Sequence, residues 1–152
     1  MIEKKLKSIN PKNNIRIRSW DVPSFNDINI MIRKTGQAQM NWSKIDLILR
    51  LDFVKNLSNI LCQRAEEMSV LMADEIGKPK KQGIGEISKC VWLCDYYVKN
   101  SEQLLIDKRV KTEFYESFVT YRPIGLVLGI MPWNFPFWQV FRYAIPSLIV
   151  GN

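Results

Sequence analysis

The chain has 152 residues, of which 47% are hydrophobic and 24% charged, so it has ordinary globular composition and can bury a core. This length allows one compact domain and leaves no room for a multidomain enzyme. Most of the formal net charge of +7 lies in the first twenty residues. The complete lack of histidine excludes histidine general bases, Ser-His-Asp and Cys-His catalysis, and most zinc or iron sites.

Residues 1–20 form a basic N-terminal arm in which six cations accompany one acid, Glu3. A nucleic-acid-binding protein would place its cations along a folded face with aromatic side chains between them. We therefore expect a solvated arm and no nucleic-acid partner. The arm lacks the apolar stretch of a secretory signal, so no targeting segment is predicted. The cations are Lys4, Lys5, Lys7, Lys12, Arg16 and Arg18.

Residues 21–110 carry the apolar spacing of helices. A helix is predicted from an N-cap at Ser43 to about residue 61. A second is predicted over 64–76, because a glycine and a proline follow it with helix-stop chemistry. A third is predicted over about 80–103, although two glycines weaken its first turn.

The pattern changes near residue 111. Apolar and polar residues alternate over 111–121, which predicts a half-buried strand. The continuous apolar run 124–131 predicts a strand covered on both faces, followed by a tight loop and a helix from Phe137. Residues 123–141 carry no formal charge, but their prolines and polar side chains argue against a membrane span.

Two sequence features have competing interpretations. Cys90 and Cys94 stand four residues apart and could face a metal together, but no third ligand is in reach, so core packing is favoured for both and for Cys62. The odd cysteine number favours a reducing compartment, the cytoplasm. Gly83-Ile84-Gly85 resembles the start of a phosphate loop, yet no strand precedes it, which favours a simple turn.

Asn134 lies between prolines and aromatic residues, just after the predicted buried strand. Open α/β sheets place their ligands at the carboxyl ends of such strands, which favours a functional site. The alternative is an asparagine that only caps the following helix.

The run from residue 122 to 152 resembles the cofactor-domain segment of the NAD(P)-dependent aldehyde dehydrogenase family. The shared residues are Arg122-Pro123-Ile124-Gly125, Ile130-Met131-Pro132-Trp133-Asn134-Phe135-Pro136, Pro146 and Gly151-Asn152. Upstream landmarks extend the resemblance over residues 8–152: Trp42, Arg50, Glu75-Ile76-Gly77-Lys78-Pro79, Gly85-Glu86 and Tyr96-Tyr97. The resemblance implies an α/β fold of N-terminal helices plus the first strand–loop–helix of a Rossmann-like cofactor domain, in incomplete form.

The resemblance also implies roles for individual residues. In the family, the asparagine matching Asn134 donates its side-chain amide to the oxyanion that forms when a thiolate attacks an aldehyde. A fixed donor there lowers the barrier by about 3–4 kcal/mol. NAD or NADP is the implied cofactor. The implied cofactor-side residues are Ile130, Met131, Pro132 and Trp133, and the implied substrate-facing residues are Phe135, Gln139 and Arg142.

Arg142 narrows the implied substrate. The run from Phe137 to Arg142 is similar to that of succinate-semialdehyde dehydrogenases, which carry an arginine eight residues after the asparagine. A guanidinium there could clamp a carboxylate with two parallel hydrogen bonds, which implies succinate semialdehyde as the aldehyde substrate. The alternative is a surface cation on the helix.

By the same resemblance, the chain divides into an arm (1–20), the helical part of the cofactor-binding domain (21–110), an oligomerisation-type strand (111–122) and the first strand–loop–helix (123–152). The catalytic domain is absent. The family's glycine-bearing turn, glutamate base and nucleophilic cysteine would lie beyond residue 152. We therefore expect the chain by itself to be inactive, to hold the cofactor weakly and to leave apolar surface over 124–150 uncovered.

Three readings follow from this expectation. The favoured one is a truncated, inactive aldehyde dehydrogenase. The second is half of a split enzyme, whose partner is a complementary C-terminal polypeptide. The third is a non-catalytic module that pairs with a homologous full-length subunit through residues 111–121.

Overall fold

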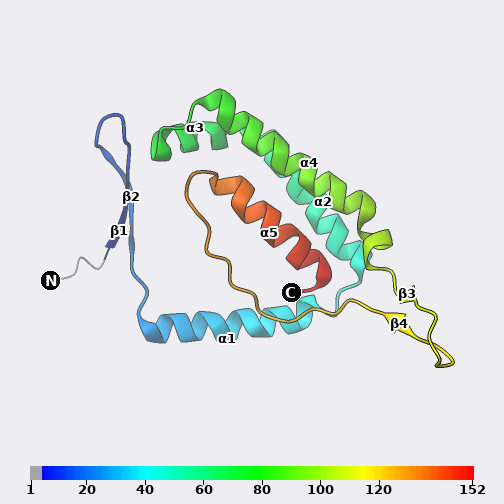
Figure 1. Cartoon of the computed structure of the whole chain (residues 1–152). Coiled ribbons are helices and arrows are strands. Elements are labelled where there is room, and N and C mark those ends of the chain that lie inside the picture. The colour runs from blue at the N-terminus through cyan, green and yellow to red at the C-terminus, as the bar shows by residue number, and fades with distance from the viewer. Residues whose placement is uncertain (1–4) are drawn as a thin grey trace.

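The computed structural model describes residues 5–152, so the first four residues of the predicted basic arm lie outside the described part. Five helices and four short strands in this range confirm the α/β class. The long helix α4 packs against α2, α3 and α5 (Figure 1). In chain order the elements are β1 (Lys5–Ile9), β2 (Arg16–Asp21), α1 (Phe25–Trp42), α2 (Leu47–Gln63), α3 (Ala65–Ile76), α4 (Lys80–Leu105), β3 (Lys108–Arg109), β4 (Phe118–Val119) and α5 (Pro136–Val150).

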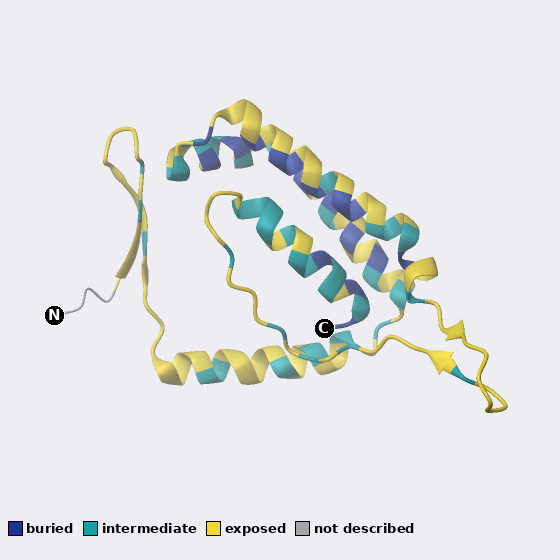
Figure 2. Ribbon diagram, in the orientation of Figure 1, coloured by how far each residue is buried: buried dark blue, intermediate teal, exposed yellow. Residues whose placement is uncertain are grey.

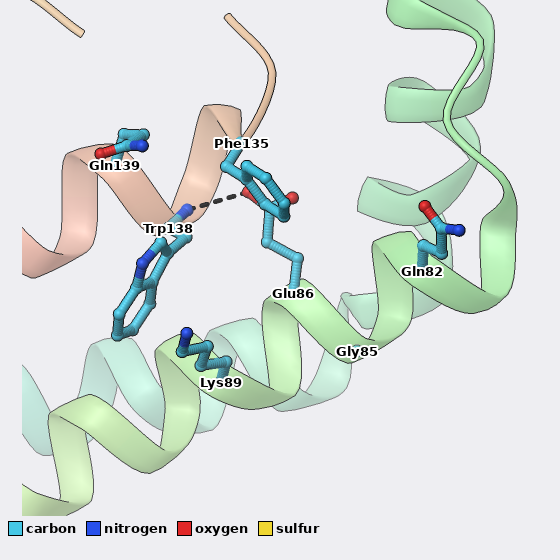
Figure 3. Close-up of a pocket in the computed structure, with 7 residues that line it drawn as sticks. All are labelled: Gln82, Gly85, Glu86, Lys89, Phe135, Trp138 and Gln139. Carbon is cyan, nitrogen blue, oxygen red and sulfur yellow. Dashed lines mark hydrogen bonds between the residues drawn. The ribbon is translucent and has the colours of Figure 1, made fainter. Parts of the chain in front are cut away.

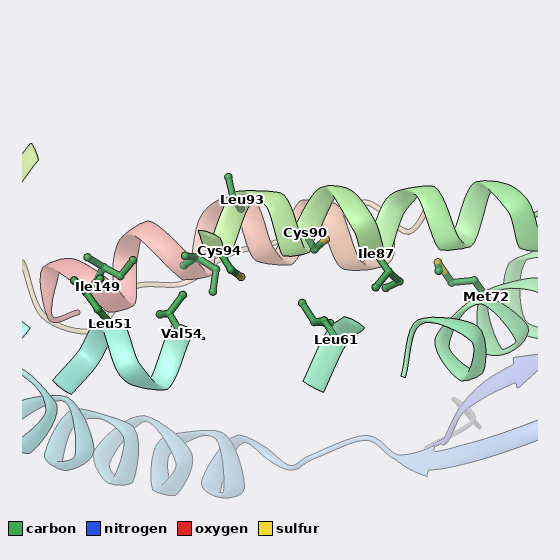
Figure 4. Close-up of a cluster of buried hydrophobic side chains, with 10 residues drawn as sticks. Leu51, Val54, Leu61, Met72, Ile87, Cys90, Leu93, Cys94 and Ile149 are labelled. Atoms are coloured by element: carbon green, nitrogen blue, oxygen red, sulfur yellow. The ribbon is translucent and has the colours of Figure 1, made fainter. Parts of the chain in front are cut away.

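The hydrophobic core lies between α2, α3, α4 and α5, and the burial colouring of Figure 2 places most of the buried positions on these helices. Each helix contributes residues at three- and four-residue spacing, so one stripe of each is removed from water. The core side chains, drawn in Figure 4, are Leu51, Val54, Leu61, Met72, Ile87, Cys90, Leu93, Cys94, Ile145 and Ile149.

The three cysteines divide between core and surface. Cys90 and Cys94 are buried, which confirms core packing for these two, and burial raises the pKa of Cys90 to about 12 and that of Cys94 to about 11. The expectation for Cys62 is wrong, because its side chain is exposed. Cys62 follows the buried Leu61, and one residue turns the side chain about 100° around the helix, away from the core.

Of the glycines at predicted turns, one ends a helix as expected and two do not. Gly77 adopts the left-handed conformation with φ 69° and ends α3 as predicted. The turn expected at residues 83–85 is wrong, because both glycines lie inside α4. At Gly83, an added Cβ would lie 3.0 Å from Met72 Cε and 3.1 Å from Ser69 Cα, so glycine permits the close approach of α3 and α4.

The sequence analysis predicts no separate helix over Phe25–Trp42, where the structure has α1. Its N-terminus carries a capping box, in which Ser24 Oγ accepts from Asp27 N and the Asp27 carboxylate accepts from Ser24 N. Ser43, predicted as the N-cap of the next helix, instead ends α1 by donating its N–H to Gln39 O. The N-cap position of α2 is Asp46.

The described part of the basic arm is mostly exposed, as expected of a solvated segment, but it is also folded, which the sequence analysis does not predict. From Lys5 onward it forms an antiparallel hairpin of β1 and β2, with Asn14 in the left-handed conformation at the turn. Asparagine tolerates this conformation better than most residues. The hairpin contacts α3 through Ser8 Oγ, which donates to Glu75 Oε1 at 2.9 Å.

Between α4 and α5 the chain is mostly extended and forms little sheet. The strand predicted over 111–121 is reduced to β4, which pairs with β3 over two residues. The strand predicted over 124–131 is wrong, because no other strand among residues 5–152 lies beside it to supply ladder hydrogen bonds. The cover expected on both faces is also not observed, since the side chains of Ile124 and Leu128 are 85% exposed while Val127 is half-buried.

Candidate functional site

The first turn of α5 is capped by a side chain from another helix. Pro136 starts α5 with the φ that a helix requires, and Phe135 at the N-cap position provides no side-chain cap. Glu86 of α4 replaces it, because its Oε1 accepts from the backbone N–H groups of Phe137 and Trp138, each at 2.9 Å. The bond from Trp138 is drawn in Figure 3. A carboxylate at this position also complements the positive end of the helix dipole.

The other oxygen of Glu86 is paired with Lys78. The two side chains form an ion pair that is nearly dry, with 8% of the Lys78 side chain and 1% of the Glu86 side chain exposed. Lys78 Nζ also donates to the backbone carbonyl of Asn134 at 3.1 Å and lies 4.0 Å from the centre of the Phe135 ring. One buried cation therefore joins α4 to the loop that precedes α5.

Asn134 combines a held backbone with a free side chain. Its carbonyl accepts from Lys78, whereas its side chain is exposed and makes no hydrogen bond within the described residues 5–152. The helix-cap alternative is not observed, since the N-cap position of α5 belongs to Phe135. The Asn134 amide is thus free to donate to a ligand.

A cavity of about 520 Å³ opens beside this loop, within the size range of small-molecule sites. Its walls come from α4 and from the start of α5 (Figure 3). Lys89 lies at its edge, with Nζ 4.0 Å from the centre of the Trp138 ring. The lining residues are Gln82, Gly85, Glu86, Lys89, Phe135, Trp138 and Gln139.

The structure brings some predicted site residues together and separates others. Phe135 and Gln139, predicted to face substrate, both line the cavity, whereas Arg142 is exposed and lies one turn further along α5. The predicted cofactor-side residues 130–133 precede Asn134 in the extended segment and do not line the cavity. Ile130 and Trp133 among them are strongly exposed.

In the sequence, Lys78 and Glu86 stand within motifs that carry the family resemblance, but no role is predicted for either residue. The helical spacing of Glu86 indicates that it is buried, because it lies on the same stripe of α4 as Gly83, Ile87 and Cys90, all of which are buried. A carboxylate on a buried stripe requires partners. That requirement identifies a polar contact but not the loop that supplies it.

Residues 5–152 contain neither a candidate membrane span nor a candidate metal cluster. No helix there combines the length and apolar character needed to cross a bilayer. No cluster of three potential metal-ligating side chains occurs there either.

Known proteins match the chain over nearly its whole length. A model of the aldehyde dehydrogenase family matches residues 2–152. A probable NADP(+) succinate-semialdehyde dehydrogenase from Synechocystis sp. is 35% identical over 145 residues, which is 95% of this chain and 32% of that protein. The NAD(P)+ succinate semialdehyde dehydrogenase of Escherichia coli K12 is 32% identical over 95% of this chain and 31% of its own length.

A solved structure shows the same similarity to succinate-semialdehyde dehydrogenases. The succinic semialdehyde dehydrogenase of Streptococcus pyogenes, solved in complex with NADP+, superposes with a TM-score of 0.91 at 25% identity. That alignment covers 96% of this chain and 32% of the S. pyogenes chain. The chain therefore spans about a third of the length of the relatives it matches and has the fold of their N-terminal part.

Proposed function

Because this chain belongs to the aldehyde dehydrogenase family, we propose that it forms the N-terminal third of an NAD(P)-dependent enzyme that oxidises succinate semialdehyde. The observation that carries the proposal is the free side-chain amide of Asn134 on a backbone held by Lys78, next to a cavity. A pre-positioned neutral donor of this kind stabilises negative charge that develops on an aldehyde oxygen.

Asn134 acts on the oxyanion that forms when a thiolate attacks the aldehyde carbon. None of the cysteines of this chain suits the role of that thiolate. Burial raises the pKa of Cys90 and of Cys94, which keeps both thiols neutral, and Cys62 lies on α2, which contributes nothing to the cavity. The thiolate and the general base come from residues outside this chain, and the chain by itself is inactive.

The cofactor site is proposed to include residues 130–133. Ile130 and Trp133 expose large apolar side chains directly before Asn134, and such surface fits one face of a nicotinamide ring. NAD or NADP, when bound, accepts the hydride of the aldehyde. The phosphate groups require backbone N–H donors of the kind found at glycine-bearing turns, which belong to the rest of the enzyme.

Arg142 is proposed to select the substrate. Phe135 and Gln139 line the cavity, and Arg142 follows Gln139 by three residues on the same face of α5. An aldehyde entering this cavity with its carbonyl toward Asn134 extends its other end along α5. The Arg142 guanidinium then binds the distal carboxylate of succinate semialdehyde with paired hydrogen bonds.

The proposal is tested by reconstitution. This chain is co-expressed with a polypeptide comprising the remaining two thirds of the Synechocystis relative, and reduction of NADP+ by succinate semialdehyde is followed by absorbance. We expect turnover only when both polypeptides are present. Asn134→Ala should then reduce kcat by about 100- to 1000-fold. Turnover by the chain alone, or unchanged turnover by the Asn134 variant, contradicts the proposal.

The substrate part of the proposal has its own control. Butanal has the length of succinate semialdehyde without its carboxylate. Arg142→Ala should raise KM for succinate semialdehyde and leave KM for butanal nearly unchanged. An equal rise in KM for both aldehydes would show that Arg142 has a structural role and does not bind the substrate carboxylate.

A further inference from the structure

We propose that the buried Lys78–Glu86 ion pair is the device that positions Asn134 for catalysis, an inference that rests on the proposed function. Lys78 and Glu86 are positioning residues, because they contact the backbone around Asn134 rather than the reacting atoms. Neither residue follows from the family resemblance as a participant in the reaction.

The first step of the argument concerns Glu86. Its two oxygens have separate tasks, since Oε1 accepts from the N–H groups of Phe137 and Trp138 while Oε2 accepts from Lys78. With 1% of its side chain exposed, Glu86 has almost no contact with water. The carboxylate therefore fixes the start of α5 relative to α4.

The second step concerns Lys78. Its Nζ donates to Glu86 and to the carbonyl of Asn134, and it lies over the ring of Phe135. Lys78 thus holds the backbone at Asn134, and through Glu86 it holds the backbone three and four residues later. The backbone is therefore held at the carbonyl of Asn134 and at the N–H groups of Phe137 and Trp138, which restricts where the Asn134 side chain can point.

A purely structural role is the competing explanation. Replacement of a buried ion pair by uncharged residues of similar shape is often neutral or stabilising, whereas loss of one partner strands a buried charge. A double variant that removes both charges therefore separates the two roles. It should restore folding, but it cannot restore the donor to the Asn134 carbonyl.

The test starts with the full 152-residue chain, labelled with ¹⁵N. The variants are Lys78→Met, Glu86→Gln and the double variant, and the readouts are the side-chain amide signals of Asn134 and the backbone amide signals of Phe137 and Trp138. In the double variant we expect a folded spectrum with displaced signals at these three residues. Glu67→Gln, which breaks the exposed ion pair with Arg64, is the matched control and should leave all three signals in place.

The second readout uses the reconstituted enzyme. The double variant should lose about 100-fold in kcat, the size of loss that a misplacement of about 1 Å can cause, with KM changed less than about twofold. Unmoved Asn134 signals in a folded double variant, or unchanged kcat, would overturn the positioning role. Absence of turnover in the unmodified reconstituted enzyme counts against the proposed function instead, and the spectra still decide whether the ion pair orients Asn134.

Discussion

The helical body of α2–α5 and the extended segment 106–135 are held in place by different kinds of interaction. The body buries ten apolar side chains in one cluster, whereas most side chains of the segment are exposed. The segment is instead fixed at a few points by polar contacts. Asn152 Oδ1 accepts from the N–H groups of Ile124 and Gly125, and Lys78 holds the carbonyl of Asn134.

This difference separates stability from function. Apolar burial supplies most of the free energy of folding and is spread over many contacts. The proposed site residues 130–135 lie in the segment, where the hydrogen bond from Lys78 holds the backbone carbonyl of Asn134. Truncation of buried side chains in the body should therefore lower the free energy of unfolding, while truncation of exposed side chains in the segment should change it little.

The largest expected effect contrasts two truncations of aliphatic side chains. Ile87→Ala removes a fully buried side chain of α4 and should lower the free energy of unfolding by about 2–5 kcal/mol. Leu128→Ala removes a side chain of the segment that is 85% exposed and should change it by less than about 0.5 kcal/mol. Urea denaturation measures both. Equal losses would mean that the segment is packed as firmly as the body.

A smaller effect is expected at Gly129, where the segment passes α5. A Cβ there would lie 2.7 Å from Tyr143 Cε1 and 2.7 Å from Met131 Cε, so Gly129→Ala should cost about 1–3 kcal/mol of stability. Gly85→Ala is the control, because a Cβ at Gly85 meets nothing within 4 Å. In a helix interior that change should stabilise by about 0.5–1 kcal/mol. A change in stability of the same sign in both variants would contradict the close approach of Gly129 to α5.

The cap of α1 should have a more local effect. Ser24→Ala removes the acceptor of the Asp27 N–H and should weaken α1 by about 0.5–2 kcal/mol. Because α1 contains no fully buried residue, the loss should appear as faster hydrogen exchange in its first turns rather than as global unfolding. Ser88→Ala on the exposed face of α4 is the control. Faster exchange throughout α4 in the Ser24 variant would refute this locality.

The smallest effect at neutral pH concerns the core thiols. Burial raises the pKa of Cys90 to about 12 and of Cys94 to about 11, above the ordinary 9.0. The unfolded chain therefore ionises first, so the free energy of unfolding should be unaffected below about pH 8 and fall as pH rises from 9 to 12. In the native chain at pH 8, only the exposed Cys62 should react quickly with a thiol reagent. Equal reactivity of all three thiols would disprove the burial.

The sequence predicts helices well where burial and local stop signals agree. The end of α3 at Gly77 and the burial of Cys90 and Cys94 follow from residue type and spacing. The hairpin of β1 and β2 was missed, because its few contacts with α3 are polar and leave no apolar pattern. The strand at 124–131 was wrong because a strand requires a neighbour, and no pattern within one segment reveals whether that neighbour exists.

The candidate site was predicted from the resemblance rather than from the pattern of residues. Periodicity placed Asn134 between a strand and a helix but left its role open. Lys78, which donates to the carbonyl of Asn134, and Glu86, which accepts from Phe137 N and Trp138 N, lie more than 45 residues earlier in the chain. Spacing along a helix indicated that Glu86 is buried, but only the packing of α4 against α5 shows that it caps the first turn of α5.

The contacts of α1 have a consequence for the order in which a newly made chain folds. Trp42 Nε1 donates to Leu148 O and Gln39 Nε2 donates to Gly151 O, across 106 and 112 residues. At about 5–20 residues per second, roughly 5–20 s separate the synthesis of Trp42 from that of Leu148. Most of the stability of a helix in a protein comes from tertiary packing, so α1 leaves the ribosome early and docks late. During that interval its apolar face is available to chaperones, because the residues that α1 contacts at the end of α5 have yet to be made.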